Sequence, residues 1–250
     1  MDSGFFDMEA AKQIQQALLP KQPPVIPGFK MGYYYAPRKS VGGDYCDFVE
    51  MDKKHLAIVV ADVSGHGVAG ALVAAQMRTF IRSEVERGTA PKELMVRLNK
   101  MIHESTPTQV FATMIYMVLE IRKNRVTYLN AGHPPMIVKR WKASKLDLYA
   151  HQSLAVGVDG GPRFKEKLVE DRFILEPGDM VLAYTDGITE ATNPLGQQFQ
   201  DQFYKLVLEH SARPWQEMSW FILGELHAFA KKEKQDDDIT MVSLRYTGQA

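Results

Sequence analysis

The stretch Ile58–Ala75, which reads IVVADVSGHGVAGALVAA, decides the fold class of this chain. An apolar run typical of a buried strand ends at a single carboxylate, Asp62, and a Ser-Gly-His-Gly turn follows it. The small residues after the turn predict a closely packed helix. A strand that fixes an acid, glycines that admit backbone or ligand, and a helix N-terminus that favours anions together make a common kind of site. Asp62 alone fits two interpretations, because aspartate also caps turns and helices.

The composition is that of an ordinary globular protein. The chain has 250 residues, 45% of them hydrophobic and 24% charged, which is enough for one large domain or two small ones. Its formal net charge is zero, so bulk electrostatics does not indicate a nucleic-acid or membrane partner. One cysteine, Cys46, excludes a disulfide framework and a cysteine-based zinc site. We expect no membrane span and a cytoplasmic protein, because neither a signal sequence nor an apolar run of roughly 20 residues is visible.

The order of the predicted elements favours an α+β fold. Helices are expected at 68–88, 91–105, 199–210 and 214–232, and strands at 29–36, 46–51, 55–62, 110–121, 125–131, 136–141, 168–175, 180–185 and 239–246. The strands at 46–51 and 55–62 predict a hairpin, and a Glu-Pro-Gly-Asp turn predicts a second pair from 168–175 and 180–185. Because strands and helices come in blocks, we expect a layered sandwich of antiparallel sheets with helices packed outside.

The N-terminal segment predicts a short amphipathic helix at residues 7–19, followed by a proline-rich connector. The apolar stripe of this helix consists of Ala10, Ile14, Ala17 and Leu18. A lone helix of this length is marginal in water, so the stripe is expected to pack on another surface. Two possibilities remain open: the body of the same domain, or a second copy or upstream segment.

Four acids are each expected at a strand edge beside a turn. They are Asp44, Asp62, Asp186 and Asp237. Carboxylates gathered at strand ends repel one another and require protons or cations. Oxygen ligands without histidine or thiolate select hard ions such as Mg²⁺ or Mn²⁺, and two such ions can activate a water and orient a phosphoryl group. Each acid alone is more simply a turn or cap residue, but the four together indicate a metal centre.

Six short motifs follow one another along the chain. They are VGGDYCD (41–47), ADVSGHG (61–67), FATM (111–114), NAGHPP (130–135), YTDGITEA (184–191) and DDDIT (236–240). In this order they resemble the metal-dependent PPM-type protein serine/threonine phosphatases, in particular their bacterial sporulation-type, SpoIIE-like branch. The resemblance covers roughly residues 10 to 246. It implies a two-sheet antiparallel β-sandwich flanked by helices, a four-layer αββα fold. It also implies a regulatory or linker helix with its connector at 1–27, and a phosphatase domain at 28–247.

The resemblance also implies roles for individual residues. Asp62 would bridge two Mn²⁺ or Mg²⁺ ions, and the Val63 carbonyl would bind one of them. Asp186 and Asp237 would hold the other ion, and Asp44 would sit beside the pair, binding directly or through water. A metal-bound water would then attack the phosphorus of phosphoserine or phosphothreonine directly, without a phosphoenzyme.

Function and partners are further implications of the resemblance. The substrate would be a small phosphorylated anti-sigma-factor antagonist in a partner-switching pathway. The N-terminal helix would connect to an upstream sensory or receiver domain and contribute to a homodimer, so the chain is expected to be the catalytic part of a longer protein. Two alternatives remain open, a catalytically idle module that binds a phosphoprotein and a phosphatase of small phosphomonoesters.

Three positions depart from the wider family or have no fixed role. His66 is separated from Val63 by two residues, so a helix-orienting role is favoured over that of a general acid. The phosphate-binding arginine of eukaryotic relatives has no match in the motifs, and Arg38 and Lys39 are the nearby candidates. His133 is expected to fix a turn rather than to bind a metal.

Overall fold

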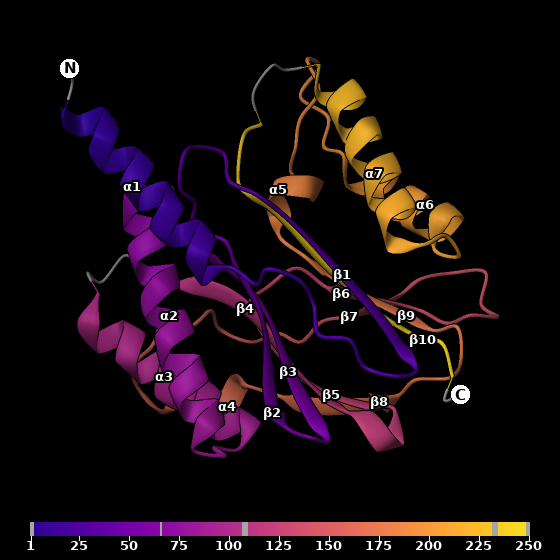
Figure 1. Ribbon diagram of the computed structural model, residues 1–250, viewed down its shortest axis with the longest axis horizontal. Coiled ribbons are helices and arrows are strands. Elements are labelled where there is room, and N and C mark those ends of the chain that lie inside the picture. Colours follow the sequence, from indigo (N-terminus) through magenta and orange to yellow (C-terminus); the bar gives the residue numbers. More distant parts are fainter. Residues whose placement is uncertain (1–2, 66, 107–109, 232–234, 249–250) are drawn as a thin grey trace.

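Two antiparallel sheets lie face to face at the centre of the molecule (Figure 1). A computed structural model describes residues 3–65, 67–106, 110–231 and 235–248, with side chains from residue 7 onward. Within these residues, the first sheet has the strand order β1-β10-β9-β6-β7 and the second the order β2-β3-β4-β5-β8. The strands are β1 (Phe29–Ala36), β2 (Tyr45–Asp52), β3 (His55–Val63), β4 (Ala112–Glu120), β5 (Arg125–Ala131), β6 (Met136–Lys139), β7 (Asp147–Tyr149), β8 (Glu170–Ile174), β9 (Met180–Tyr184) and β10 (Ile239–Tyr246).

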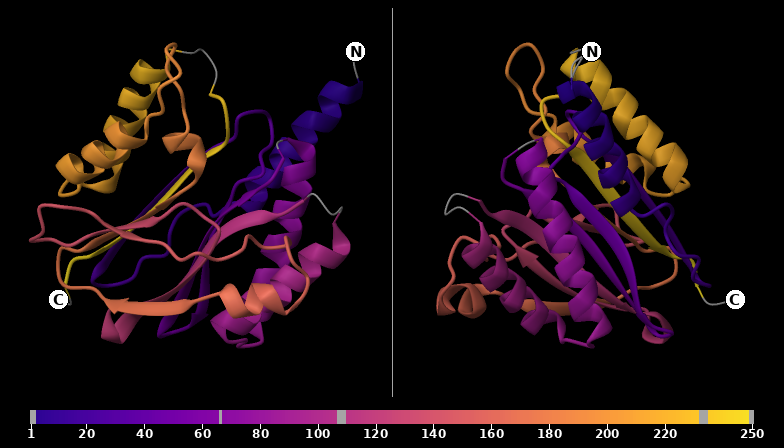
Figure 2. Two further views of the ribbon diagram at one scale, coloured as in Figure 1. Left: turned by 180° about the vertical axis from the view of Figure 1, so that it is seen from behind. Right: turned by 60° about the vertical axis from the view of Figure 1, so that its left-hand side comes forward.

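Helices cover the outer face of each sheet (Figures 1 and 2). They are α1 (Ser3–Leu18), α2 (Val68–Glu86), α3 (Pro91–Ser105), the 3₁₀ turn η1 (Ile121–Lys123), α4 (Pro162–Lys167), α5 (Asp186–Thr189), α6 (Gln200–His210) and α7 (Trp215–Ala230). The helices α2 and α3 pack on the second sheet, and α5, α6 and α7 pack on the first. The predicted α+β sandwich with four αββα layers is therefore confirmed.

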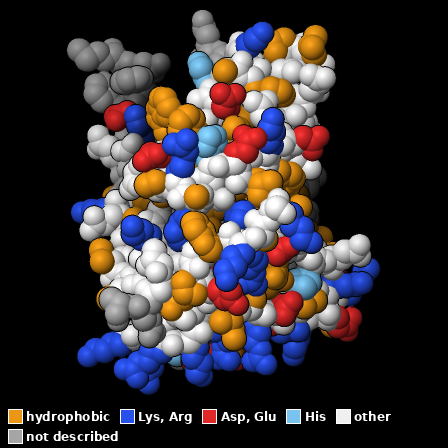
Figure 3. All heavy atoms as spheres, turned by 90° about the vertical axis from the view of Figure 1, so that its right-hand side faces the viewer, with side chains coloured by type: hydrophobic (Ala, Val, Ile, Leu, Met, Phe, Trp, Pro, Cys, Tyr) orange, Lys and Arg blue, Asp and Glu red, His pale blue; other side chains and the backbone are white. Residues whose placement is uncertain are grey.

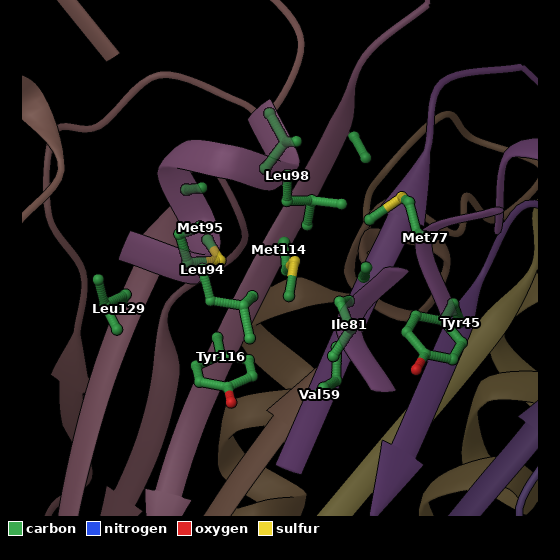
Figure 4. Close-up of a cluster of buried hydrophobic side chains, with 14 of the residues drawn as sticks. Tyr45, Val59, Met77, Ile81, Leu94, Met95, Leu98, Met114, Tyr116 and Leu129 are labelled. Carbon is green, nitrogen blue, oxygen red and sulfur yellow. The ribbon is translucent and has the colours of Figure 1, made fainter. Parts of the chain in front are cut away.

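Strict alternation along the strands divides the interior into three apolar layers. In β3, Leu56, Ile58 and Val60 face the gap between the sheets, whereas Val59 and Ala61 face the helices α2 and α3. Figure 4 shows this outer layer, where methionine, leucine and isoleucine side chains of both helices interdigitate with those of β3, β4 and β5. Because β3 is buried on both faces, its sequence is almost continuously apolar.

Most predicted elements are confirmed, four of them with their predicted bounds: 29–36, 91–105, 125–131 and 239–246. One predicted pairing is wrong. The strands β8 and β9 do not pair with each other, since β8 pairs with β5 in the second sheet and β9 pairs with β10 and β6 in the first. A turn sequence predicts only that the chain reverses direction. Here the reversal takes the chain from the second sheet to the first. The short elements β7, α4, α5 and η1 were not predicted.

The N-terminal helix α1 presents a different face to the domain from the one its apolar stripe suggests. Ile14 is 64% exposed. Ala10 and Ala17 are exposed as well, and only Leu18 of the stripe is half-buried. The side facing the domain carries Gln15, whose amide donates to the Gly42 carbonyl at 2.7 Å. A polar contact with Gly42 thus holds the inner side of the helix, while most of the stripe is exposed to solvent.

The molecular surface is mixed in character. Figure 3 shows hydrophobic and charged side chains interspersed over one face, with Lys and Arg gathered along its lower edge. None of the helices in the described part of the chain combines the length and apolar content needed to cross a bilayer.

A buried ion pair fixes helix α2 on the second sheet. Asp47 of β2 is fully buried and accepts two hydrogen bonds of 2.7 Å from the Arg82 guanidinium of α2. The same carboxylate accepts the Tyr45 hydroxyl at 2.9 Å and the Phe48 amide at 2.9 Å. Charge-assisted bidentate pairs of this kind fix geometry strongly. Since α2 begins directly after the Asp62 turn, this pair also fixes one wall of the region around Asp62.

We predict that Arg82→Ala lowers the free energy of unfolding by about 3 kcal/mol, because it leaves the Asp47 carboxylate buried with reduced compensation. Urea unfolding followed by circular dichroism measures the change. Lys100→Ala on α3 is the control, because in the Lys100–Glu104 ion pair both side chains are exposed (67% and 63%), and its loss should cost less than about 1 kcal/mol. Equal losses in the two variants would contradict the assignment.

Candidate active site

The apolar face between the two sheets ends in carboxylates and hydroxyls at one end of the molecule. In β3 the inward row Leu56, Ile58, Val60 continues with Asp62. In β2 the row Cys46 and Phe48 is preceded by Asp44. Both carboxylates therefore belong to the inter-sheet face by the period of two residues of a strand. The buried Cys46 packs within the same layer.

The first sheet contributes two hydroxyls to the same end. Thr185 follows Val181 and Ala183 on the inward side of β9, and Thr240 precedes Val242 and Leu244 on that of β10. Both threonines are fully buried. Buried hydroxyls require partners, and here the partner comes from the opposite sheet.

Asp44 joins the two sheets. Its carboxylate is 2% exposed, and its Oδ2 atom accepts the Thr185 hydroxyl at 2.8 Å and the Thr240 hydroxyl at 2.6 Å. The amide of Thr240 donates in turn to the Thr185 hydroxyl at 2.9 Å. One oxygen of Asp44 is thus committed to holding the strands β9 and β10.

The other predicted acids lie at the edges of β9 and β10. Asp186 is the first residue of α5, two residues after the end of β9, and Asp237 lies exposed just before β10. The structure therefore brings all four predicted acids to one end of the sandwich. Burial raises the pKa of Asp62 to about 7, and the charges of Asp186 and Asp237 add to this effect.

Burial and mutual repulsion affect the neighbouring acids too. Burial first, then the charges of Glu190 and Asp237, raise the pKa of Asp186 to about 6. Burial and the charge of Asp62 raise the pKa of Asp44 well above its ordinary value. The region is therefore one where negative charge is unfavourable without a compensating cation.

The loop at residues 38–44 is held by an acid that sequence reasoning missed. Asp238 is 4% exposed and accepts the backbone amide of Arg38 at 2.6 Å and that of Gly43 at 2.6 Å, with the amide of Asp44 at 3.4 Å. A Cβ atom on Gly42 would lie 2.3 Å from the same carboxylate, so only glycine admits this close approach. The run of three aspartates was the available signal, but it did not show which of them points inward.

Two further predicted positions lie beside this loop. Val63 is buried, and a Cβ on Gly43 would lie 2.7 Å from its carbonyl oxygen. Arg38 and Lys39 lie exposed in the loop, so their roles as phosphate ligands stay predictions. His66 lies outside the described residues, and its role also stays a prediction.

The donor set fits a hard divalent cation, since it consists of carboxylates and one carbonyl. As they stand, however, no three Asp, Glu, His or Cys side chains of the described residues are close enough to hold an ion together. The carboxylates are neighbours that repel one another rather than a closed ligand set. A bound cation would relieve this repulsion.

Comparison with known proteins shows the family to which this chain belongs. The family model described as stage II sporulation protein E (SpoIIE) matches residues 52–247. The chain belongs to the SpoIIE family. The curated relative phosphoserine phosphatase RsbU of Bacillus subtilis is 30% identical to this SpoIIE-family chain over 239 residues, which are 96% of this chain and 70% of RsbU.

Solved structures share the fold of this SpoIIE-family chain. The RsbU and RsbW domains of Rv1364c from Mycobacterium tuberculosis match with a TM-score of 0.79 and 25% identity, over 93% of this chain and 64% of that one. The SiaA-PP2C domain of Pseudomonas aeruginosa matches with a TM-score of 0.82 and 20% identity, over 96% of both chains. RsbX in complex with magnesium matches with a TM-score of 0.66 and 17% identity, over 90% of this chain and 98% of that one.

We predict that Asp238→Ala releases the 38–44 loop, because three backbone amides lose their acceptor. Proteolysis within this loop should accelerate while the helical content of the protein stays unchanged. Asp238→Asn keeps one acceptor oxygen and should fall between Asp238→Ala and the wild type. Loop cleavage at the wild-type rate in Asp238→Ala would refute the assignment.

The raised pKa values predict a distinct pH dependence for the metal-free protein. The pKa values of Asp62 and Asp186 are about 7 and about 6 in the folded state, whereas in the unfolded chain both acids lose their protons near the ordinary aspartate pKa of 3.8. The contribution of these acids to stability is therefore present at low pH and is lost as the pH rises from about 4 to about 7. Thermal unfolding in EDTA should show this loss, and Asp62→Asn should reduce it. An unchanged pH slope in Asp62→Asn would contradict the prediction.

Proposed function

We propose that this domain hydrolyses phosphoserine and phosphothreonine in a protein substrate, using two Mn²⁺ or Mg²⁺ ions. The observation that carries the proposal is the end of the inter-sheet face, where Asp44 and Asp62 meet the charges of Asp186 and Asp237. Membership of the SpoIIE family and the similarity to the phosphoserine phosphatase RsbU support it. The magnesium described for RsbX, which has a similar fold, is consistent with the choice of ion.

The proposal assigns a separate metal-binding role to each residue of the site. Asp62 would serve both ions and the Val63 carbonyl would hold one of them, while Asp186 and Asp237 would hold the other. Asp44 lies beside the pair, with one oxygen already committed to Thr185 and Thr240. Bound divalent ions supply positive charge for the phosphoryl oxygens and lower the pKa of a coordinated water.

Asp238 and the glycines have a supporting role in the proposal. Asp238 holds the backbone that carries Asp44. Gly187 lies so close to the Asp238 carbonyl that a Cβ atom would come within 1.9 Å of it. The residue after Asp186 must therefore be small for β10 and α5 to meet, which keeps Asp186 and Asp237 on the same edge.

The physiological substrate proposed here is a small phosphorylated anti-sigma-factor antagonist in a partner-switching pathway. The support is the similarity to RsbU along 96% of this chain. A phosphatase of small phosphomonoesters is the competing function. The ratio of kcat/KM for a phosphoserine protein to that for p-nitrophenyl phosphate distinguishes them, since a metabolite phosphatase should not prefer the protein.

Residues 1–27 are proposed as a regulatory linker and residues 28–247 as the phosphatase domain. The helix α1 contacts the VGGD loop through Gln15, whose side chain donates to and accepts from the backbone of Gly42 at 2.7 and 3.0 Å. Its outward side carries the exposed Ile14. This division of surfaces supports the proposal that α1 joins an upstream sensory or receiver domain and contributes to a homodimer.

We predict that Asp62→Ala reduces hydrolysis of a phosphoserine protein to the background rate and weakens Mn²⁺ binding, because it removes the carboxylate that would serve both proposed ions. Steady-state kinetics with Mn²⁺, Mg²⁺ and EDTA and calorimetric titration with Mn²⁺ measure the two effects. Asp201→Ala on α6, an exposed acid on the outer helical layer, is the control and should resemble the wild type. Full activity of Asp62→Ala with Mn²⁺ would refute the two-metal mechanism. A wild type with no metal-dependent activity would instead favour an idle binding module.

A further inference from the structure

His133 lies where the chain crosses from the second sheet to the first. It belongs to the connection between β5 and β6, which are strands of different sheets, and its side chain is 6% exposed. Burial lowers the pKa of its imidazole to about 3, so the ring is neutral. A buried neutral imidazole needs partners for both nitrogens.

The turn itself does not use the imidazole ring. Asn130, which is 1% exposed, accepts the His133 amide at 2.8 Å. The amide group of Asn130 donates to the carbonyls of His133 at 3.0 Å and Pro134 at 3.3 Å. Asn130 therefore supplies the hydrogen bonds within the turn, and the His133 ring makes its contacts outside the turn.

His133 instead links the two sheets, because its backbone leads into β6, which pairs with β9 in the first sheet, while its ring reaches β4 in the second. Its Nδ1 atom lies 2.8 Å from the hydroxyl of Thr113 in β4, and Thr113 is the register partner of Asp62 in β3. Its Nε2 atom is buried without a hydrogen-bond partner of normal geometry in the described residues. The backbone of Tyr184, two residues before Asp186, is close enough to raise the imidazole pKa against the larger effect of burial.

We propose that His133 is a positioning residue whose ring spans the gap between β4 and β9 and so sets the spacing between Asp62 and Asp186. The inference rests on the proposed two-metal function, since the spacing matters only if both carboxylates serve one centre. On one side His133 contacts the Thr113 hydroxyl of β4. On the other side it lies near the backbone of Tyr184, the last residue of β9. Asp44 closes the gap independently through Thr185 and Thr240, so the fold does not depend on His133 alone.

A spacer of this kind acts on metal affinity rather than on overall stability. Residues that orient metal ligands without touching the ion typically change affinity 10- to 100-fold when replaced. We therefore expect His133→Leu and Thr113→Val to weaken Mn²⁺ binding about 10-fold or more. Thr113→Ser keeps the hydroxyl and should restore the wild-type affinity. His151→Leu is the matched control, because His151 hydrogen-bonds the Tyr128 hydroxyl at 3.0 Å in another part of the inter-sheet layer.

The test is calorimetric titration of the metal-free full chain with Mn²⁺, together with thermal unfolding in EDTA. The proposal predicts weaker binding in His133→Leu and Thr113→Val, recovery in Thr113→Ser, and normal binding in His151→Leu. A combined His133→Leu/Thr113→Val variant should be no weaker than His133→Leu alone, since the two residues act through one contact. If His133→Leu fails to fold, the two Thr113 variants carry the test.

Different outcomes separate this inference from the proposed function. Wild-type affinity in Thr113→Val and His133→Leu, with binding lost in Asp62→Ala, would overturn the positioning role and leave the two-metal function intact. Equal binding by Asp62→Ala and the wild type would overturn the metal centre and this inference together. Equal weakening in Thr113→Ser and Thr113→Val would also overturn the inference, because the hydroxyl would then be irrelevant.

Discussion

The hydrogen bonds of Asp44 hold the two sheets together at the end where the acids gather. One carboxylate oxygen from the second sheet accepts hydroxyls from two neighbouring strands of the first. Along the rest of the gap the sheets meet through apolar side chains, which are non-directional and tolerate small shifts. At the polar end, by contrast, distances are fixed by hydrogen bonds that are costly to leave unmade in a buried setting. The relative positions of the four predicted acids therefore depend on these hydrogen bonds more than on the apolar packing.

The acidic side chains gather in a region where burial limits the solvation of their charges by water. The acids at this end are drawn from a strand start, a strand end, a helix start and a loop, and burial raises the pKa of Asp44, Asp62 and Asp186. Such an arrangement is unfavourable for folding alone and becomes favourable with a cation. The supporting groups, Asp238 on the loop and the ion pair of Asp47 with Arg82, keep the backbone from relaxing away from that charge.

Several parts of the fold follow from local patterns. The apolar run of β3, the glycines that follow it and the small residues of α2 are enough to predict a buried strand, a turn and a packed helix. The acids at 44, 62, 186 and 237 were identifiable because each interrupts or borders an apolar run. The partner of β8 was not identifiable, because a turn sequence reports chain reversal and carries no information on which sheet receives the next strand.

The sequence by itself determined the element types, the layered class and the acids that could form a metal centre. These depend on residue periodicity and on chemistry within a few positions of the chain. Only the tertiary structure decided that Asp238 rather than its two neighbours holds the 38–44 loop, that Arg82 pairs with Asp47, and that the ring of His133 reaches Thr113. Each of these contacts joins residues at least 20 positions apart. Their existence depends on how the two sheets and helix α2 pack together, and no local pattern encodes that.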